Sequence, residues 1–370
     1  MTTAATLKTA LPTGDKGRID WVDYAKGFCI IFVVMMHSTL GVGKAAGSEG
    51  WLHYVVEFAR PFRMPDFFMI AGLFLALVID RPWKSYLDKK VLHFIYFYLI
   101  WTFIQFGIKI PVNGAEYGYS SLPYLYLETL WEPYATLWFI YMLPIMFVVT
   151  KLLKSLPWML VFAGAALLQI APIHTGNLIV DEFASRYVYF FTGYFFAPHI
   201  FKLAEWARNN VGLGVLGLLS WAVLNGVLMF NGFSIEIDGA NTFMKFGDAP
   251  IVSLLLGFAG AVGVILVSAL LAKVSWMSFL RYCGQHSIVV YLAFFFPMAV
   301  SRAILLKLGI ISDIGTISML VTATAVIAPL VLYWIIQKIG FGYFLFVRPA
   351  WAHLDGSKPT DKKVSLTPAE

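Results

Sequence analysis

The sequence predicts an all-α fold, a polytopic membrane helix bundle with about ten transmembrane helices in one domain. Of the 370 residues, 59% are hydrophobic and only 13% are charged, whereas a soluble domain carries about 25% charged residues. Apolar segments long enough to span a bilayer recur along the chain, and Lys and Arg gather in alternate connecting segments. These observations exclude a soluble protein and indicate that the lipid bilayer surrounds the chain.

The transmembrane helices are predicted from uninterrupted apolar stretches of helical length. Turn-forming residues separate them, including Arg81-Pro82, Pro111, Pro133, Pro157 and Asn231-Gly232. The expected helices cover residues 22–43, 62–80, 91–110, 135–150, 157–174, 186–203, 211–231, 249–271, 284–306 and 314–338.

The distribution of basic residues predicts the orientation, because cytoplasmic loops are enriched in Lys and Arg. Both ends of the chain fall on the basic side, so both termini are predicted to be cytoplasmic. The chain then divides into a cytoplasmic tail (1–21), a transmembrane domain (22–340) and a partly disordered cytoplasmic tail (341–370). The opposite, outer side holds fewer basic residues, namely Lys44, Arg60, Arg63, Lys109, Arg186, Lys245, Arg302 and Lys307.

Several functional classes are disfavoured by composition. The basic residues are scattered among apolar segments, so we expect no nucleic-acid partner. The 7 histidines are dispersed and no pair of residues has metal-ligand spacing, so we expect no metal. Cys29 and Cys283 fall in or beside apolar segments, where we expect buried small side chains and no disulfide.

The first predicted helix places two ionisable groups on one face. Lys26 and His37 are separated by about three helical turns, or about 16 Å, and Asp23 lies on the same side. An ionisable group within a membrane helix usually faces the bundle interior and marks a functional site. His37, in the outer half, suits a general base, although a packed histidine that bonds a neighbouring helix is the alternative.

The segment 60–68 leads into the second predicted helix from the outer side. Arg63 and Asp66 lie one turn apart and are expected to pair. If a short loop brings this helix beside the first one, Asp66 orients the imidazole of His37, and Arg60 and Arg63 hold an anionic group. The alternative is an interfacial anchor of snorkelling arginines.

Lys90 and His93 begin the third predicted helix at its cytoplasmic end. They lie one turn apart, and two cations at this mouth suit a phosphorylated cytoplasmic ligand. Simple anchoring by basic residues is the alternative, and we prefer it for Lys89.

Other polar residues are weaker candidates for lining a substrate site. Glu128 precedes Trp138 at the outer end of the fourth predicted helix, where a solvated loop acid is the alternative role. Ser287 and Tyr291 lie one turn apart, and Gly284 before them permits a close backbone approach. Hydrogen bonding between helices is the alternative for both.

Five segments in order resemble the membrane acyltransferase-3 family of polytopic O-acyltransferases, most closely the branch that includes fucose 4-O-acetylases. They run from Ile19-Asp20-Trp21 to His37, through Met64-Pro65-Asp66-Phe67-Phe68, residues 89–98 and Leu137-Trp138-Phe139, to Gly284 with Ser287 and Tyr291. Many members have arginine at the position of Lys26, histidine at that of Arg63, and an arginine pair at those of Lys90 and His93.

The resemblance implies a bacterial inner-membrane enzyme that transfers an acyl group, most often acetyl, from acyl-CoA to a hydroxyl of a sugar or cell-envelope glycan. His37 would then be the base, Asp66 and Arg63 its catalytic neighbours, and Lys26, Lys90 and His93 the acyl-CoA ligands. Arg60, Trp138, Glu128, Ser287 and Tyr291 would line the acceptor site. A transporter or flippase for a small polar solute or lipid-linked glycan is the alternative function, a scaffold is the third, and a homodimer is compatible with the sequence.

Overall fold

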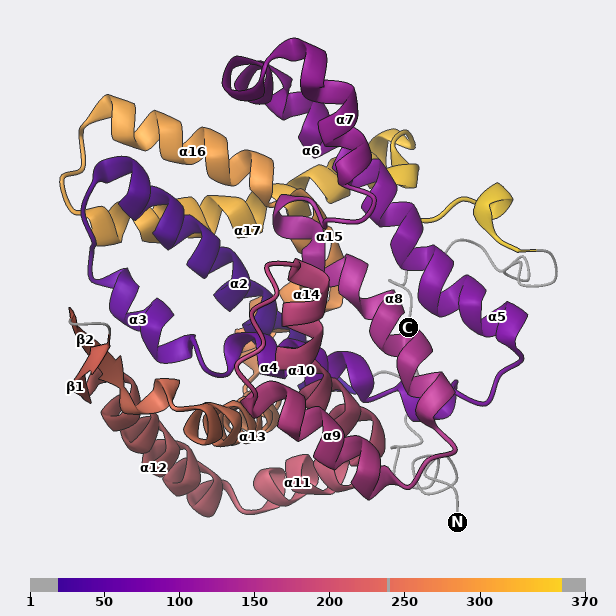
Figure 1. Ribbon diagram of the computed structural model, residues 1–370, viewed down its shortest axis with the longest axis vertical. Helices are drawn as coiled ribbons and strands as arrows, with labels where there is room; N and C mark the ends of the chain where they lie inside the picture. Colours follow the sequence, from indigo (N-terminus) through magenta and orange to yellow (C-terminus); the bar gives the residue numbers. More distant parts are fainter. Residues whose placement is uncertain (1–18, 238–239, 355–370) are drawn as a thin grey trace.

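The computed structural model describes residues 19–237 and 240–354, which form a bundle of α-helices with one small β-hairpin (Figure 1). The first half contains α2 (Asp20–Ala46), α3 (Leu52–Ala59), α4 (Arg63–Gly72), α5 (Trp83–Leu87), α6 (His93–Tyr117), α7 (Leu122–Glu128), α8 (Trp138–Leu153) and α9 (Trp158–Ile170). The second half contains α10 (Leu178–Phe195), α11 (Ala197–Asn209), α12 (Val211–Phe230), β1 (Gly232–Ile237), β2 (Ala240–Lys245), α13 (Pro250–Leu271), α14 (Ser278–Gln285), α15 (Ser287–Ala293), α16 (Phe295–Leu308) and α17 (Ile314–Ile339).

The all-α membrane bundle is confirmed, but the count of about ten spans is not. Among the described residues, 6 helices are long and apolar enough to cross a membrane, or 7 if α15 and α16, bent by 56°, make one span. Those 6 are Asp20–Ala46, Trp83–Tyr117, Ala135–Leu153, Val211–Phe230, Pro250–Leu271 and Ile314–Ile339. Helix α9 is apolar but shorter.

Three of the expected helices are broken in the structure. The stretch 62–80 contains α4 and then only a short 3₁₀ turn, Leu75–Leu77. The stretch 186–203 crosses the junction of α10 and α11, where Pro198 occupies the first turn of α11 and cannot donate into α10. The stretch 284–306 is divided among α14, α15 and α16. Apolar composition alone does not reveal such breaks.

Local structure differs from the expectation in three further places. Pro111 lies inside α6, which continues to Tyr117, as proline in a membrane helix can when its surroundings satisfy the freed backbone groups. A π-helical turn, Asp88–Leu92, joins α5 to α6. The region expected to be an irregular outer loop after α12 instead forms the antiparallel hairpin β1–β2, with Gly232 paired to Lys245.

Glycines set the closest helix contacts. A Cβ atom at Gly284 would overlap the carbonyl oxygen of Asp23, and one at Gly27 would overlap that of Leu280. The backbones of α2 and α14 are therefore in direct contact, as Gly284 predicted. Gly72 and Gly193 make the equivalent contact between α4 and α10. Small residues let two helices approach closely. In a membrane this matters because burying apolar side chains gives little preference for one helix arrangement over another.

The chain after α17 packs back onto the start of α6. Tyr96 Oη donates to the carbonyl of Phe344 at 3.0 Å, and Trp101 Nε1 donates to that of Leu345 at 2.8 Å. Thus residues 341–354, part of the predicted C-terminal tail, lie against the bundle. The predicted tail residues 1–18 and 355–370 lie outside the described residues.

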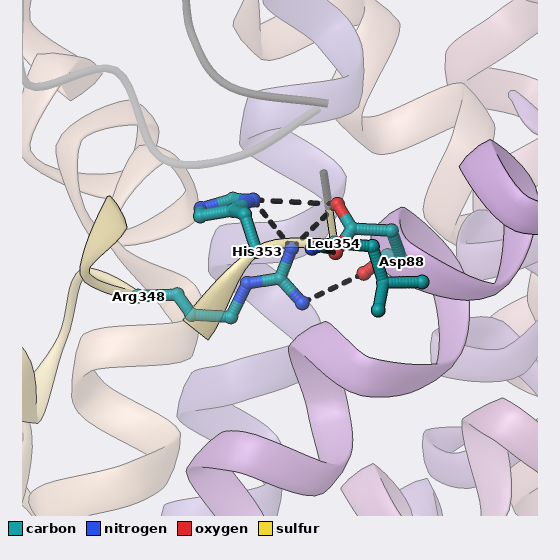
Figure 2. A network of polar contacts seen from close by, with 4 residues as sticks. All are labelled: Asp88, Arg348, His353 and Leu354. Carbon is teal, nitrogen blue, oxygen red and sulfur yellow. Dashed lines mark hydrogen bonds and ion pairs between the residues drawn. The ribbon is translucent and has the colours of Figure 1, made fainter. Parts of the chain in front are cut away.

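A buried ion pair fixes this C-terminal segment (Figure 2). Arg348 Nη2 donates to Asp88 Oδ2 at 2.7 Å, and Arg348 Nη1 donates to the Asp88 carbonyl at 2.7 Å. The backbone N–H of Leu354 donates to Asp88 Oδ1 at 2.9 Å, and His353 Nδ1 lies 3.3 Å from Oδ2. Both side chains of the pair are almost fully buried, at 2% and 0% exposed.

We predict that Gly284→Ala destabilises the bundle by about 1–3 kcal/mol, the range for overpacking, because two backbones would have to separate. Thermal unfolding in detergent measures this. The matched control is Gly164→Ala in α9, where an added Cβ meets nothing within 4 Å, so its unfolding temperature should stay the same or rise. Equal behaviour of the two variants would contradict the close contact.

Removing one partner of the buried pair should also be costly. Arg348→Met leaves the Asp88 carboxylate buried without its guanidinium, and we predict a loss of about 3–5 kcal/mol and faster proteolysis within residues 341–354. Lys154→Met is the control, because its 2.9 Å pair with Asp80 is exposed on both sides and is worth about 1 kcal/mol or less. A proteolysis rate unchanged by Arg348→Met would show that other contacts hold the segment.

Candidate functional site

Helix α2 presents Lys26 and His37 to the bundle interior, as predicted. Between them on the same face, at helical spacing, lie Ile30 and Val33, which are 0% and 4% exposed. Both ionisable residues are themselves only partly buried. The face of α2 that carries Lys26 and His37 is therefore turned toward the interior of the bundle and not toward lipid.

His37 lies between an aromatic ring and a cation. Its imidazole packs against Phe294, with ring centroids 5.5 Å apart, at the bend between α15 and α16. The charge of Arg63 acts on it from α4. On the next turn of α2, Arg302 of α16 fills the space beside Gly41. The imidazole is thus held in an apolar wall with positive charge nearby.

Arg63 is the group with the greatest unsatisfied hydrogen-bonding capacity near His37. Its Nε and Nη1 atoms are buried and have no hydrogen-bond partner among residues 19–237 and 240–354. The charges that act on this guanidinium most strongly are those of Arg186, Arg60 and Glu57. Buried guanidinium donors are normally satisfied, so these two donors are available to a ligand oxygen.

Asp66 is not where the sequence placed it. Its carboxylate makes no ion pair with Arg63 and no contact with His37 in the described part of the chain. It is buried, and it lines a small cavity with Ile200 of α11 and Ala261, Val264 and Ile265 of α13. Helix α4 packs directly against α2, and the Gly72–Gly193 contact with α10 fixes its rotation, so that Asp66 lies toward α11 and α13.

Arg60 belongs to a network that secures the hairpin. Its Nε lies 3.3 Å from Glu57 Oε1, and its Nη2 pairs with Asp248. Lys245 at the end of β2 also bonds Glu57 Oε1, at 2.5 Å. The guanidinium is thus already paired within the protein, and its predicted part in substrate binding gains no support from the geometry.

The inner end of the site combines Lys90 and His93 with the C-terminal segment. Lys90 Nζ lies 5.2 Å from the ring centre of Phe147, and His93 packs on Phe94 and Phe97. The charges of Arg348, Lys90, His353 and Asp88 all act on His93. Lys26 lies 6.0 Å from the ring centre of Phe74. Arg348 and His353 were missed in the sequence because they lie far along the chain from Asp88.

Tyr291 has a structural role in the outer half of the bundle. Its hydroxyl donates to the carbonyl of Thr136 and accepts from the N–H of Phe139 at 3.2 Å, so it anchors the start of α8. Trp138 is next to this anchor and packs on Phe68 at 6.1 Å. Ser287 begins α15 and is half-buried. Hydrogen bonding between helices, the alternative considered for Tyr291, is what the structure shows.

Glu128 is half-buried at the end of α7 and makes no ion pair with any residue that the structure describes. The structure does not bring it to His37. Within residues 19–237 and 240–354, no group of three His, Cys, Asp or Glu side chains is placed to hold a metal ion. Cys29 and Cys283 are buried and unpaired, as expected.

Comparison with known proteins identifies the family. The family model described as an acyltransferase domain matches residues 19–338. The inner membrane protein YcfT of Escherichia coli K12 is 28% identical over 173 residues, which cover 41% of this chain and 48% of that protein. The alignment therefore spans about half the length of this relative. No solved structure matches.

Three findings point to the same family. They are the bundle of apolar helices, the inward-facing His37 and Arg63, and the family match over nearly the whole described chain. The similarity to an inner membrane protein also supports a multi-pass location in the inner membrane. The chain belongs to the acyltransferase-3 family, whose model is described as an acyltransferase domain, and it is a multi-pass integral membrane protein.

Proposed function

We propose that the protein transfers an acyl group, most often acetyl, from cytoplasmic acyl-CoA to a hydroxyl of a sugar or cell-envelope glycan. The single observation that carries the proposal is an inward-facing imidazole, His37, within range of the charge of Arg63, whose buried Nε and Nη1 atoms have no partner in the described part of the chain. A base and an oxyanion-binding donor near one another in an apolar interior are the groups that acyl transfer requires.

In this mechanism His37 takes the proton of the acceptor hydroxyl as its oxygen attacks the thioester carbonyl. The negative charge that develops on the carbonyl oxygen faces the Nε and Nη1 donors of Arg63. Collapse of the tetrahedral intermediate breaks the carbon–sulfur bond, and the imidazolium returns the proton to the leaving thiolate. The products are the O-acylated sugar and free CoA thiol. Asp66 is given no part, because it lines a small cavity together with residues of α11 and α13.

The donor would approach from the inner side. Lys90 and Lys26 supply positive charge for its phosphates, with His93 as a neutral hydrogen-bonding group, and the inward face of α2 leads from Lys26 to His37 over about 16 Å. An extended pantetheine arm spans such a distance, whereas adjacent groups would not need one. The separation of Lys26 from His37 along α2 thus supports a donor with a long arm.

A transporter or flippase is the second candidate, and the observation in its favour is that two ionisable residues of α2, Lys26 and His37, face inward. A proton-coupled transporter would also keep an ionisable group inside the bundle. The two functions differ in one product, because only the transferase releases free thiol from acyl-CoA.

We predict that His37→Ala lowers sugar-dependent thiol release from acetyl-CoA by at least about 10²-fold, the usual contribution of general-base catalysis. The assay uses purified protein in proteoliposomes with a panel of sugars and a thiol reagent. His199→Ala is the matched control, because His199 is exposed on α11, and it should retain full activity. Near-normal release by a folded His37→Ala protein would refute the base assignment.

The donor assignment gives a separate prediction. Lys90→Ala should raise the KM for acetyl-CoA about 10- to 100-fold, since a charge-assisted contact contributes about 1.5–3 kcal/mol, and it should leave the KM for the sugar unchanged. Lys89→Ala, on an exposed neighbouring side chain, should change neither value. The same assay, run at varied donor concentration, decides this, and equal effects of both variants would indicate non-specific surface charge.

A further inference from the structure

Helix α6 carries an inward-facing polar stripe, which the mechanism above does not use and of which only the first residue, Tyr98, belongs to the segments that resemble the family. Its members recur at intervals of three or four residues and so share one face of the helix. They are Tyr98, Thr102, Gln105, Lys109 and Asn113. On the other side of α6, Leu99, Phe103 and Ile110 are exposed apolar residues, as expected where lipid surrounds the helix.

The two ends of the stripe are satisfied within the protein. Tyr98 Oη donates to the carbonyl of Thr129 at 2.5 Å and accepts from the N–H of Tyr134 at 3.1 Å. Asn113 Nδ2 donates to Tyr134 Oη at 3.4 Å. These contacts hold the segment before α8 against α6 and leave the middle of the stripe to be explained.

Gln105, in the middle, is buried at 2% exposure and has no hydrogen-bond partner for either Nε2 or Oε1 among the described residues. The hydroxyl of Thr136 is likewise buried and unpartnered within that part of the chain, and its 3₁₀ turn, Ala135–Leu137, contacts α6. An unsatisfied buried polar group costs about 1–3 kcal/mol. A ligand that supplies the missing partners would offset that cost.

The stripe connects to the catalytic histidine through adjacent aromatic residues. Lys109 Nζ lies 4.7 Å from the ring centre of Phe295 and 5.2 Å from that of Tyr134. Phe294, the preceding residue, packs on His37. At the bend between α15 and α16, Phe294 therefore contacts His37 and the next residue, Phe295, contacts the stripe of α6.

We propose that Gln105, with Thr136 and Lys109, binds the hydroxyl-rich acceptor and presents one of its hydroxyls to His37. A carboxamide places one donor and one acceptor side by side, which complements adjacent sugar hydroxyls that each donate and accept. The inference rests on the proposed transfer to a sugar. It assigns the acceptor to the outer part of α6 and the donor to the inner end of the bundle.

The test replaces Gln105 with methionine, which has nearly the same shape and no hydrogen-bonding amide. Gln105→Met is assayed for thiol release from acetyl-CoA with L-fucose, D-glucose or N-acetylglucosamine at varied concentration. The KM for the sugar should rise about 10- to 100-fold for two lost hydrogen bonds. The KM for acetyl-CoA and the slow thiol release without sugar should stay unchanged.

Gln169→Met on α9 is the matched control, because Gln169 Oε1 is also buried without a partner among residues 19–237 and 240–354. It should leave all kinetic values at the wild-type level. An unchanged sugar KM in Gln105→Met, or the same change in Gln169→Met, would overturn this inference while leaving the proposed function intact. Wild-type protein that releases no thiol with any sugar would overturn the proposed function, and this inference with it.

If Gln105→Met lowers the unfolding temperature, Gln105→Asn decides instead. It keeps the polar amide but withdraws it by one methylene, so the sugar KM should still rise at an unchanged acetyl-CoA KM. A sugar KM equal to that of the wild type in a folded Gln105→Asn protein would overturn the assignment.

Discussion

The direct backbone contact between α2 and α14, made through Gly27 and Gly284, is the constraint on which the site depends. In a bilayer, helices gain little from hiding apolar surface, so close packing must choose the arrangement. The contact fixes both the position and the rotation of α2, and the rotation decides that Lys26 and His37 face inward. The equivalent contact of α4 with α10 brings Arg63 beside His37 and turns Asp66 away. Two glycine contacts therefore select which ionisable groups share the site.

The bundle has different polar groups at its inner end and in its outer half, and this difference explains how one apolar bundle can serve two polar substrates. At the inner end Lys90 lies near His93, and Arg348 is paired with Asp88. The charge of Lys90 suits a phosphorylated donor. The outer half offers hydroxyl and amide groups along α6 and a guanidinium beside His37. Between these ends the inward face of α2 is apolar at Ile30 and Val33, so water has few partners there. Exclusion of water favours transfer to the sugar over hydrolysis of the thioester.

The sequence predicted what depends on helical periodicity within one element. Lys26 and His37 lie on one continuous helix, so their shared inward face followed from spacing alone. The predicted pairing of Asp66 with Arg63 failed because the rotation of α4 is set by its glycine contact with α10, which no local pattern reveals. The pairing of Arg348 with Asp88 and the role of Phe294 depend on tertiary packing that no local pattern encodes. The α6 stripe at Gln105 was visible in principle as polar residues at helical spacing, but its significance needed the unpartnered amide.

The measurement that tests this account most directly is a structure of the protein in lipid nanodiscs with a non-hydrolysable thioether analogue of acetyl-CoA. The account predicts that the phosphates lie beside Lys90 and His93, that the pantetheine arm follows the inward face of α2, and that the carbonyl oxygen lies within hydrogen-bonding distance of Arg63, next to His37. An analogue whose acyl end lies away from His37, or whose phosphates lie at the outer end of the bundle, would contradict it.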